Sequence, residues 1–239
     1  MDFEVARSPQ LHNPIPDGCV LYLPLWHNEL SGSVLSSCDD FRHACTVTGA
    51  TWGSTGRIFA GGDDLININA ALTPLAANTT GGIGLWVMMP DATPAAINSL
   101  YSFGDTNAIE LIDMRVETDG KITCQAWDAG TAQWVFKTNA AVMADNTFKF
   151  LLLVQNGTSP VLYVNGSLEA ITYSTSTDKT KWFSALTGLD NGRVGCISYN
   201  SSGNVQFLTG TVGEAFAHSR ALSAGEIQHI YQVTKWRYS

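Results

Sequence analysis

Residues 210–231, GTVGEAFAHSRALSAGEIQHIY, decide the fold because they join a strand directly to a short amphipathic helix. In the first half every second residue is large, beginning with Val212 and Glu214, which is the period of a β-strand. Ser223 and Glu226 then have the S-x-x-E spacing of a capping box, with an apolar residue on either side of it. The apolar residues that follow recur at helical spacing and predict one face that can lie on a sheet. The end of the chain therefore predicts a β protein with one C-terminal helix.

The composition agrees with an all-β domain. The chain has 239 residues, of which 45% are hydrophobic and 22 are glycines. This length suffices for one large domain with a full core. Only 14% of the residues are charged, against roughly 25% in an average soluble protein. Neutral Thr, Ser, Asn and Gln must therefore cover much of the surface, which favours an exported or particle-borne protein over a cytosolic enzyme.

Charge and hydropathy argue against several kinds of partner. The net charge is -8, and the 13 Lys and Arg residues are scattered along the chain. Binding to nucleic acid needs clustered cations, so neither nucleic acid nor another anionic polymer is an expected ligand. No run reaches the roughly 18 apolar residues of a membrane span, and residues 1–16 contain no apolar segment of a signal peptide. We expect a virion or extracellular location, reached without a signal peptide.

The five cysteines do not indicate a disulfide framework. Their number is odd and their spacing is not paired, so at least one is free. Cys45, Cys124 and Cys196 each lie in a strand-like run and are expected to be small buried hydrophobes. A local bridge between Cys38 and Cys45 is the less favoured alternative.

Many short strand-like segments alternate with turns, at a spacing typical of a two-sheet sandwich. Asn165-Gly166 is the clearest hairpin turn, because a type I′ turn needs positive φ at both central residues. Asp119-Gly120 predicts a second hairpin. Residues 148–154, FKFLLLV, are apolar on both faces and predict a central strand.

The predicted organisation is simple. We expect residues 1–16 to form an extended N-terminal arm that ends in two prolines, because the residue before a proline favours extended backbone. Residues 17–239 are expected to form a single two-sheet antiparallel jelly-roll sandwich.

Six pieces of the chain, in their order, carry a family resemblance across about residues 17–235. They resemble the laminin-G-like branch of the concanavalin A-like lectin/glucanase jelly rolls, in which similar pieces follow one another. The pieces are LYLPLW (21–26), DDFRHACTVTGATW (39–52), FAGGDDLIN (59–67), GIGLWVMM (82–89), LYVNG (162–166) and GTVGEAFAHSRALSAGEI (210–227). The resemblance implies a sandwich of two curved sheets, one structural calcium ion, and carbohydrate binding on a face or rim.

The implied calcium ligands match the family only in part. Asp39 matches the loop aspartate, and Asp63, Asp64 and Glu214 could add carboxylate oxygens to backbone carbonyls of the neighbouring glycines. Calcium takes six to eight oxygen ligands, yet the aspartates expected at positions 60 and 213 are Ala and Gly here. The alternative is structural, with Asp63 and Asp64 capping a turn and Glu214 bonded to Arg220 or to backbone amides.

Catalysis is disfavoured by the spacing of the carboxylates. A retaining glucanase needs two carboxylates roughly 5 Å apart, and a strand supplies them from alternate residues. In residues 110–117, Glu110 falls on one face of a regular strand, whereas Asp113 and Glu117 fall on the other with Arg115. We expect a solvated face with a cross-strand ion pair and no enzyme activity.

The aromatic residues offer the best binding candidates. Sugars present apolar C–H faces, so their sites combine an exposed aromatic ring with polar side chains. Trp127 and Trp134 flank one predicted hairpin loop, with Asp128 beside them. These three residues are the predicted glycan-binding patch, although cross-strand packing is the alternative explanation. Trp26 and Trp86 are expected in core strands.

These observations favour a non-catalytic binding or assembly domain. Few charges, a short arm and no signal peptide suit a structural or appendage protein of a prokaryotic virus, such as a decoration, fibre or tail protein. Its expected partners are other virion proteins, host-surface glycans and further copies of itself in a homo-oligomer. A secreted carbohydrate-binding module is the first alternative, and a glucanase-like glycoside hydrolase is the second.

Overall fold

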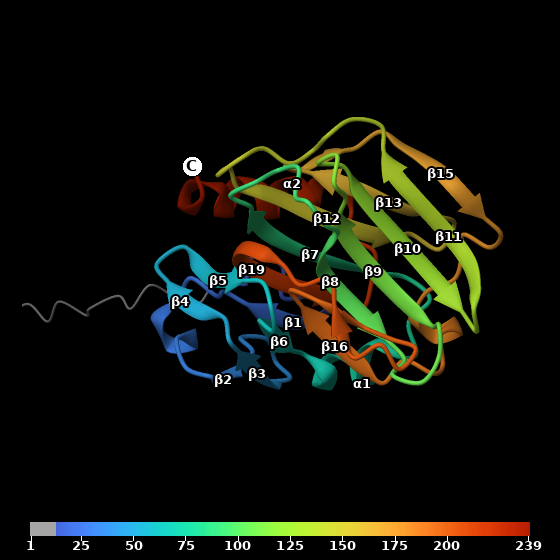
Figure 1. Cartoon of the computed structure of the whole chain (residues 1–239), viewed down its shortest axis with the longest axis horizontal. Coiled ribbons are helices and arrows are strands. Elements are labelled where there is room, and N and C mark those ends of the chain that lie inside the picture. Colours follow the sequence, from blue (N-terminus) through green and yellow to red (C-terminus); the bar gives the residue numbers. More distant parts are fainter. Residues whose placement is uncertain (1–12) are drawn as a thin grey trace, which may run out of the picture.

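A computed structural model describes residues 13–239, which form a sandwich of two antiparallel sheets (Figure 1). The jelly-roll prediction is therefore confirmed. The eight-stranded sheet runs in the order β14 (Ser167–Leu168), β13 (Pro160–Val164), β12 (Lys149–Gln155), β7 (Gly81–Met88), β19 (Thr209–His218), β5 (Gly56–Ala60) and β4 (Thr51–Gly53), with β1 (Cys19–Leu23) also paired to β19. 

The nine-stranded sheet runs in the order β15 (Ile171–Ser176), β11 (Thr131–Thr138), β10 (Ile122–Asp128), β9 (Leu111–Val116), β8 (Asn98–Gly104), β16 (Asn191–Val194), β6 (Leu65–Asn67), β3 (Ala44–Thr48) and β2 (Val34–Ser36). A separate pair, β17 (Ile197–Ser198) and β18 (Asn204–Val205), completes the strands. In Figure 1, β8 to β11 form the near layer, with β7, β12 and β13 behind them.

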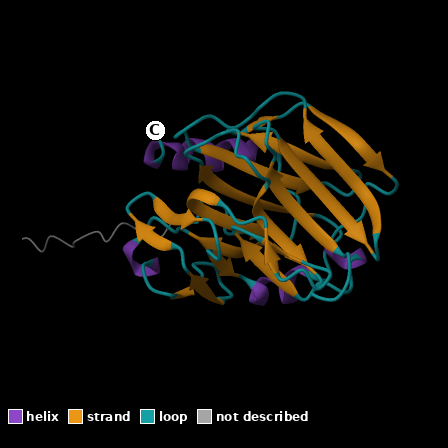
Figure 2. Cartoon of the chain, in the orientation of Figure 1, coloured by secondary structure: helices purple, strands orange, loops and turns teal. Residues whose placement is uncertain are grey.

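Helical structure is scarce (Figure 2). Besides α2 (Ala224–Thr234), the described residues form one short helix, α1 (Leu72–Leu75). They also form the 3-10 turns η1 (Asn28–Leu30), η2 (Asn69–Ala71), η3 (Phe183–Ala185) and η4 (Lys235–Arg237). Of these helical segments, the sequence pattern predicts only α2. No helix among residues 13–239 is long and apolar enough to span a bilayer.

The predicted cap of α2 is confirmed. The Ser223 hydroxyl accepts a hydrogen bond from the Glu226 N–H, and the Glu226 carboxylate accepts one from the Ser223 N–H. Ile227 and Ile230 are buried in a second core cluster on the outer side of the eight-stranded sheet, with Trp86 of β7 and residues of β12 and β19. Strand β12 is therefore covered on both faces, as its sequence predicts.

Turn chemistry accounts for one hairpin fully and for another in part. Asn165 and Gly166 have φ of 50° and 80°, as a type I′ turn requires between β13 and β14. At the β9–β10 turn only Gly120 has positive φ, at 72°. The Glu117 N–H donates to the carbonyl of Lys121, so three residues, 118–120, form the loop instead of two.

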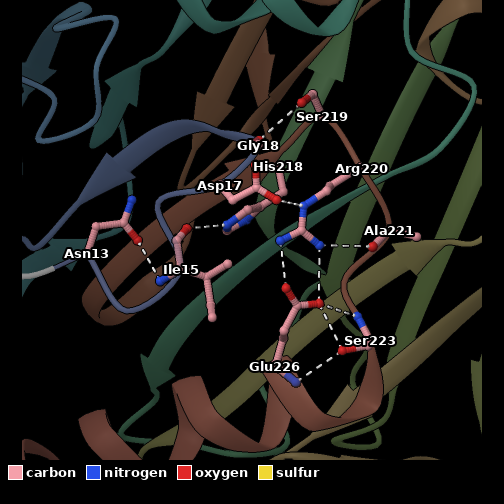
Figure 3. Close-up of polar contacts among 10 residues, drawn as sticks. All are labelled: Asn13, Ile15, Asp17, Gly18, His218, Ser219, Arg220, Ala221, Ser223 and Glu226. Atoms are coloured by element: carbon pink, nitrogen blue, oxygen red, sulfur yellow. Dashed lines mark hydrogen bonds and ion pairs between the residues drawn. The ribbon is translucent and has the colours of Figure 1, made fainter.

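The described part of the predicted N-terminal arm is attached to the domain (Figure 3). The buried His218 Nε2 lies 3.0 Å from the carbonyl oxygen of Ile15. The Arg220 guanidinium contacts Asp17 at 2.8 Å and Glu226 at 2.6 Å. One arginine thus connects the residues before β1 to the first turn of α2. The rest of the predicted arm, residues 1–12, lies outside the described residues.

All five cysteines are free thiols. Cys45, Cys124 and Cys196 are buried, as predicted, and Cys19 is buried as well. Burial raises the pKa of Cys45 and Cys196 to about 12. These thiols remain protonated and act as small core residues.

Candidate functional site

The outward side of the nine-stranded sheet is polar, whereas its inward side is apolar. Along β10, Ile122, Cys124 and Ala126 point into the core, so the alternate residues point outward. β9 and β11 pair with β10 on either side, and Gln125 lies opposite Asp113 and Val135. We call six outward side chains of these three strands the Trp127 face: Asp113, Arg115, Thr123, Gln125, Trp127 and Lys137.

Trp127 is fixed in place by a chain of hydrogen bonds that crosses three strands. Its Nε1–H donates to Gln125 Oε1 at 3.0 Å. The Gln125 amide donates to Asp113 Oδ2 at 3.4 Å, and the Ser99 hydroxyl donates to Asp113 Oδ1 at 2.6 Å. Ser99 also lies 3.3 Å from the carbonyl oxygen of Cys196, which precedes β17. The indole is partly exposed, and its orientation is set before any ligand arrives.

Asp113 is the buried charge of this network. Its side chain is fully buried, and burial raises its pKa from 3.8 to about 6. The nearby Arg115 guanidinium, at 3.8 Å, and the two hydrogen bonds oppose that rise. Arg115 also contacts Glu117 at 2.9 Å. The predicted solvated face with a cross-strand ion pair is therefore wrong in two respects. Asp113 is buried, and the Arg115–Glu117 pair joins two residues of the same segment instead of two neighbouring strands.

Asp128 lies at the end of the Trp127 face. Its carboxylate contacts the Lys181 ammonium at 3.1 Å. Glu110 is near this pair and is itself buried, and its Oε1 accepts a hydrogen bond from the Gly188 N–H at 2.7 Å. Burial raises the pKa of Glu110, and the negative charges of Asp128 and Asp105 add to the rise.

Trp134 does not belong to the predicted glycan patch. It is fully buried, and its Nε1–H donates to the Lys181 carbonyl at 2.9 Å. The reason is a register shift between Ala126 and Trp127, which places Ala126 opposite Trp134. Ala126 points into the core, so Trp134 does too. Trp127 and Asp128 remain a predicted site, without Trp134.

The predicted calcium ligands do not form a metal site. Asp39 accepts hydrogen bonds from the Tyr22 and Phe41 N–H groups, both at 2.9 Å. Asp64 accepts one from the Ala60 N–H at 2.6 Å, which is the turn-capping alternative. Across residues 13–239, no three His, Cys, Asp or Glu side chains come together so that they could hold a metal ion.

Glu214 and Asp63, the other two predicted calcium ligands, are also separate from a metal site. Glu214 is fully buried, and its Oε1 accepts hydrogen bonds from Trp26 Nε1 at 3.0 Å and from Arg237 at 2.8 Å. Arg220, the alternative partner predicted for Glu214, pairs with Glu226 and Asp17 instead. Asp63 is exposed. The four carboxylates therefore do not fit the calcium that the resemblance implied.

Two tryptophans expected in core strands differ from each other. Trp86, on β7, is buried, and its Nε1–H donates to the Thr234 hydroxyl of α2. Trp26 lies in a turn after β1 and is only partly buried. Its ring contacts the guanidinium of Arg237, whose central carbon lies 4.3 Å from the ring centre.

The sequence belongs to a known family. A family model described as the concanavalin A-like lectin/glucanases superfamily matches residues 60–228. The chain is therefore a member of that superfamily, and the resemblance seen in the sequence is confirmed. A comparison with curated proteins gave no match.

Solved structures with the same fold include parts of sialidases. The carbohydrate-binding module CBM40 of the Ruminococcus gnavus IT-sialidase, bound to α2,3-sialyllactose, has a TM-score of 0.61 at 17% identity, over 73% of this chain and 94% of that one. The leech intramolecular trans-sialidase has a TM-score of 0.62 at 22% identity, over 74% of this chain. Trypanosoma rangeli sialidase has a TM-score of 0.66 at 15% identity, over 93% of this chain. The match spans only 27% of the leech enzyme and 34% of the T. rangeli enzyme.

Proposed function

We propose that this domain binds carbohydrate on the Trp127 face and performs no chemistry on it. The observation that carries the proposal is a partly exposed indole, held by Gln125, on the same sheet face as Arg115 and Lys137. A sugar ring would pack its C–H face on Trp127. The likeness to a sialidase carbohydrate-binding module bound to sialyllactose supports the same use of the fold.

The polar side chains around Trp127 suit hydroxyl groups. Arg115 and Lys137 are partly exposed cationic donors on this face, whereas Thr123 and Gln125 are only 4% and 6% exposed and lie beneath its surface. Both cations have carboxylate partners, Glu117 for Arg115 and Asp119 for Lys137 at 2.9 Å. Because the side chains are already oriented by these contacts, less conformational entropy is lost on binding.

The carboxylates support binding without catalysis. Asp113 is buried beneath the network, Glu117 is paired with Arg115, and Glu110 accepts from Gly188. A retaining glycosidase would need two carboxylates that converge on one bond from either side. Each of these three carboxylates instead has a structural partner, and Asp113 has no exposed surface.

Titration calorimetry with the full chain tests this proposal, after a glycan array has selected a sugar. We expect Trp127→Ala to weaken binding at least roughly fivefold, since stacking on an aromatic ring contributes on the order of 1 kcal/mol or more. Trp52→Ala is the matched control, because Trp52 is also partly exposed, at 37%, but lies on β4 of the other sheet. Unchanged affinity in Trp127→Ala, or no bound glycan on the array, would contradict the proposal.

The finer expectation, a virion structural or appendage role, rests on composition and on the N-terminal sequence. It remains a prediction, as do the homo-oligomer and the extracellular or virion location. Mass spectrometry of purified particles checks the location, and light scattering of the purified chain checks the oligomer. A monomer that is found in no particle would leave a separate carbohydrate-binding module as the better description.

A further inference from the structure

A second groove lies on the opposite sheet, beside the C-terminal helix. Its volume is about 360 Å³, and it lies where α2 and η4 meet the outer side of β7 and β12. Aromatic rings and one amine dominate its walls. The residues that matter are Phe148, Asn165, Tyr231, Lys235, Trp236 and Tyr238.

Trp236 is exposed but held in one orientation. The side chain is 66% exposed, and its Nε1–H donates to the Val233 carbonyl at 2.9 Å. The guanidinium carbon of Arg237 lies 4.8 Å from its ring centre and 4.3 Å from that of Trp26. Arg237 is in turn fixed by its ion pair with the buried Glu214. A large apolar ring that is oriented in this way and left open to solvent is a ready platform for a ligand.

Lys235 gives the groove a positive charge. The residue is exposed, and its ammonium lies 5.5 Å from the centre of the Tyr231 ring. No carboxylate of residues 13–239 forms an ion pair with it, whereas Arg237, two residues further on, is paired with Glu214. In an acidic protein, an amine beside the Tyr231 ring and without a carboxylate partner favours a ligand that brings its own negative charge.

We propose that this groove binds a sugar residue that carries a carboxylate. The C–H face of the ring packs on Trp236, and the carboxylate pairs with the Lys235 ammonium. The site is independent of the Trp127 face, because the two lie on the outer sides of different sheets. A domain with two such sites would bind two glycans at once and gain avidity on a glycan-covered surface.

Fluorine NMR of the full chain labelled with 5-fluorotryptophan tests both sites separately. The seven tryptophans give separate signals, which Trp127→Phe and Trp236→Phe assign. The probes are 3′-sialyllactose and a hyaluronan tetrasaccharide, with lactose as the neutral comparison. We expect the Trp236 signal to shift with at least one acidic probe at concentrations up to about 10 mM and to shift much less with lactose. Lys235→Gln should weaken this binding roughly fivefold or more.

Lys179→Gln is the matched control, since Lys179 also lies over a tyrosine ring, 5.1 Å from the centre of Tyr173, but outside the groove. It should leave the Trp236 titration unchanged, as should Trp127→Phe. A Trp236 signal that is indifferent to both acidic probes overturns the groove proposal, whether or not the Trp127 signal moves. If lactose shifts the Trp236 signal as much as the acidic probes do, and Lys235→Gln does not weaken the binding, the assignment of a carboxylate ligand is overturned.

Discussion

Arg237 and Glu214 form an ion pair at 2.8 Å that joins the last residues of the chain to β19, with the Glu214 side chain 1% exposed and that of Arg237 15% exposed. Burial raises the pKa of Glu214, and the arginine opposes the rise. Arg237→Met should leave a buried carboxylate without its counter-ion and lower the free energy of unfolding by roughly 3 kcal/mol. Urea unfolding at pH 7 measures this.

The double variant is the control for this pair. Glu214→Gln combined with Arg237→Met removes both charges, and we expect it to recover part of the loss because no buried charge remains unpaired. If the double variant loses as much unfolding free energy as the two single variants lose together, the two charges are not energetically coupled.

Asp113 should give the domain an unusual dependence on pH. Because its folded pKa, about 6, lies above its ordinary 3.8, the folded state holds this proton more tightly. Its contribution to stability is present below about pH 4 and is lost as the pH rises to about 6, with a magnitude on the order of 1–3 kcal/mol. Urea unfolding across this range measures the free energy of unfolding of wild type and of Asp113→Asn. As the pH rises, the variant should become more stable relative to wild type. A constant difference would contradict the burial argument.

His218 should make stability depend on pH in the opposite direction to Asp113. Its pKa is lowered by burial, its Nδ1 is buried without a hydrogen-bond partner, and Arg220 nearby also disfavours a positive charge, which Glu226 and Asp17 partly offset. The unfolded state therefore binds the proton more tightly, so the stabilisation is present above about pH 6.5 and is lost as the pH falls below it.

Hydrogen exchange measures this effect at the attached segment. On lowering the pH from about 7.5 to 5.5, wild type should lose protection relative to His218→Gln at Ile15 and Cys19, whose N–H groups donate to Asn13 Oδ1 and to the Pro16 carbonyl, after correction for intrinsic rates. Glutamine has no titrating ring but can still donate to the Ile15 carbonyl. Equal changes in the two proteins would show that His218 does not titrate in this range.

The two tryptophans of the β10–β11 hairpin should respond oppositely to replacement. Trp134→Phe removes the hydrogen bond to the Lys181 carbonyl and leaves a cavity at a fully buried position, so it should cost roughly 1–3 kcal/mol of stability without changing sugar affinity. Trp127→Phe should cost less than about 1 kcal/mol and should still weaken binding. Parallel thermal unfolding and calorimetry check this, and a sugar affinity that depends on Trp134 alone would contradict the site.

Local patterns in the sequence predict much of the fold. The cap of α2 needs only Ser223 and Glu226, and the β13–β14 turn needs only Asn165 and Gly166, so neighbouring residues suffice to predict both. The two-sided burial of β12 also follows from its uninterrupted apolar run, because α2 covers the outer face.

The site is less predictable because it depends on register. An unshifted hairpin would place Trp134 opposite Gln125 and hence on the Trp127 face, but one extra residue in β11 turns it into the core. The network through Gln125, Asp113 and Ser99 joins three strands and a loop. No spacing within one segment predicts this network. The sequence alone places Asp113 and Gln125 only on two neighbouring predicted strands.

The alternation along β9, β10 and β11 makes this sheet a convenient scaffold for engineering. Thr123, Val135 and Lys137 point away from the core, while their chain neighbours Ile122, Cys124 and Phe136 fill it. A library that varies only Val135 and Lys137, which are partly exposed, would diversify recognition while conserving the hydrophobic interior. New specificities could then be selected on a framework whose folding is left untouched.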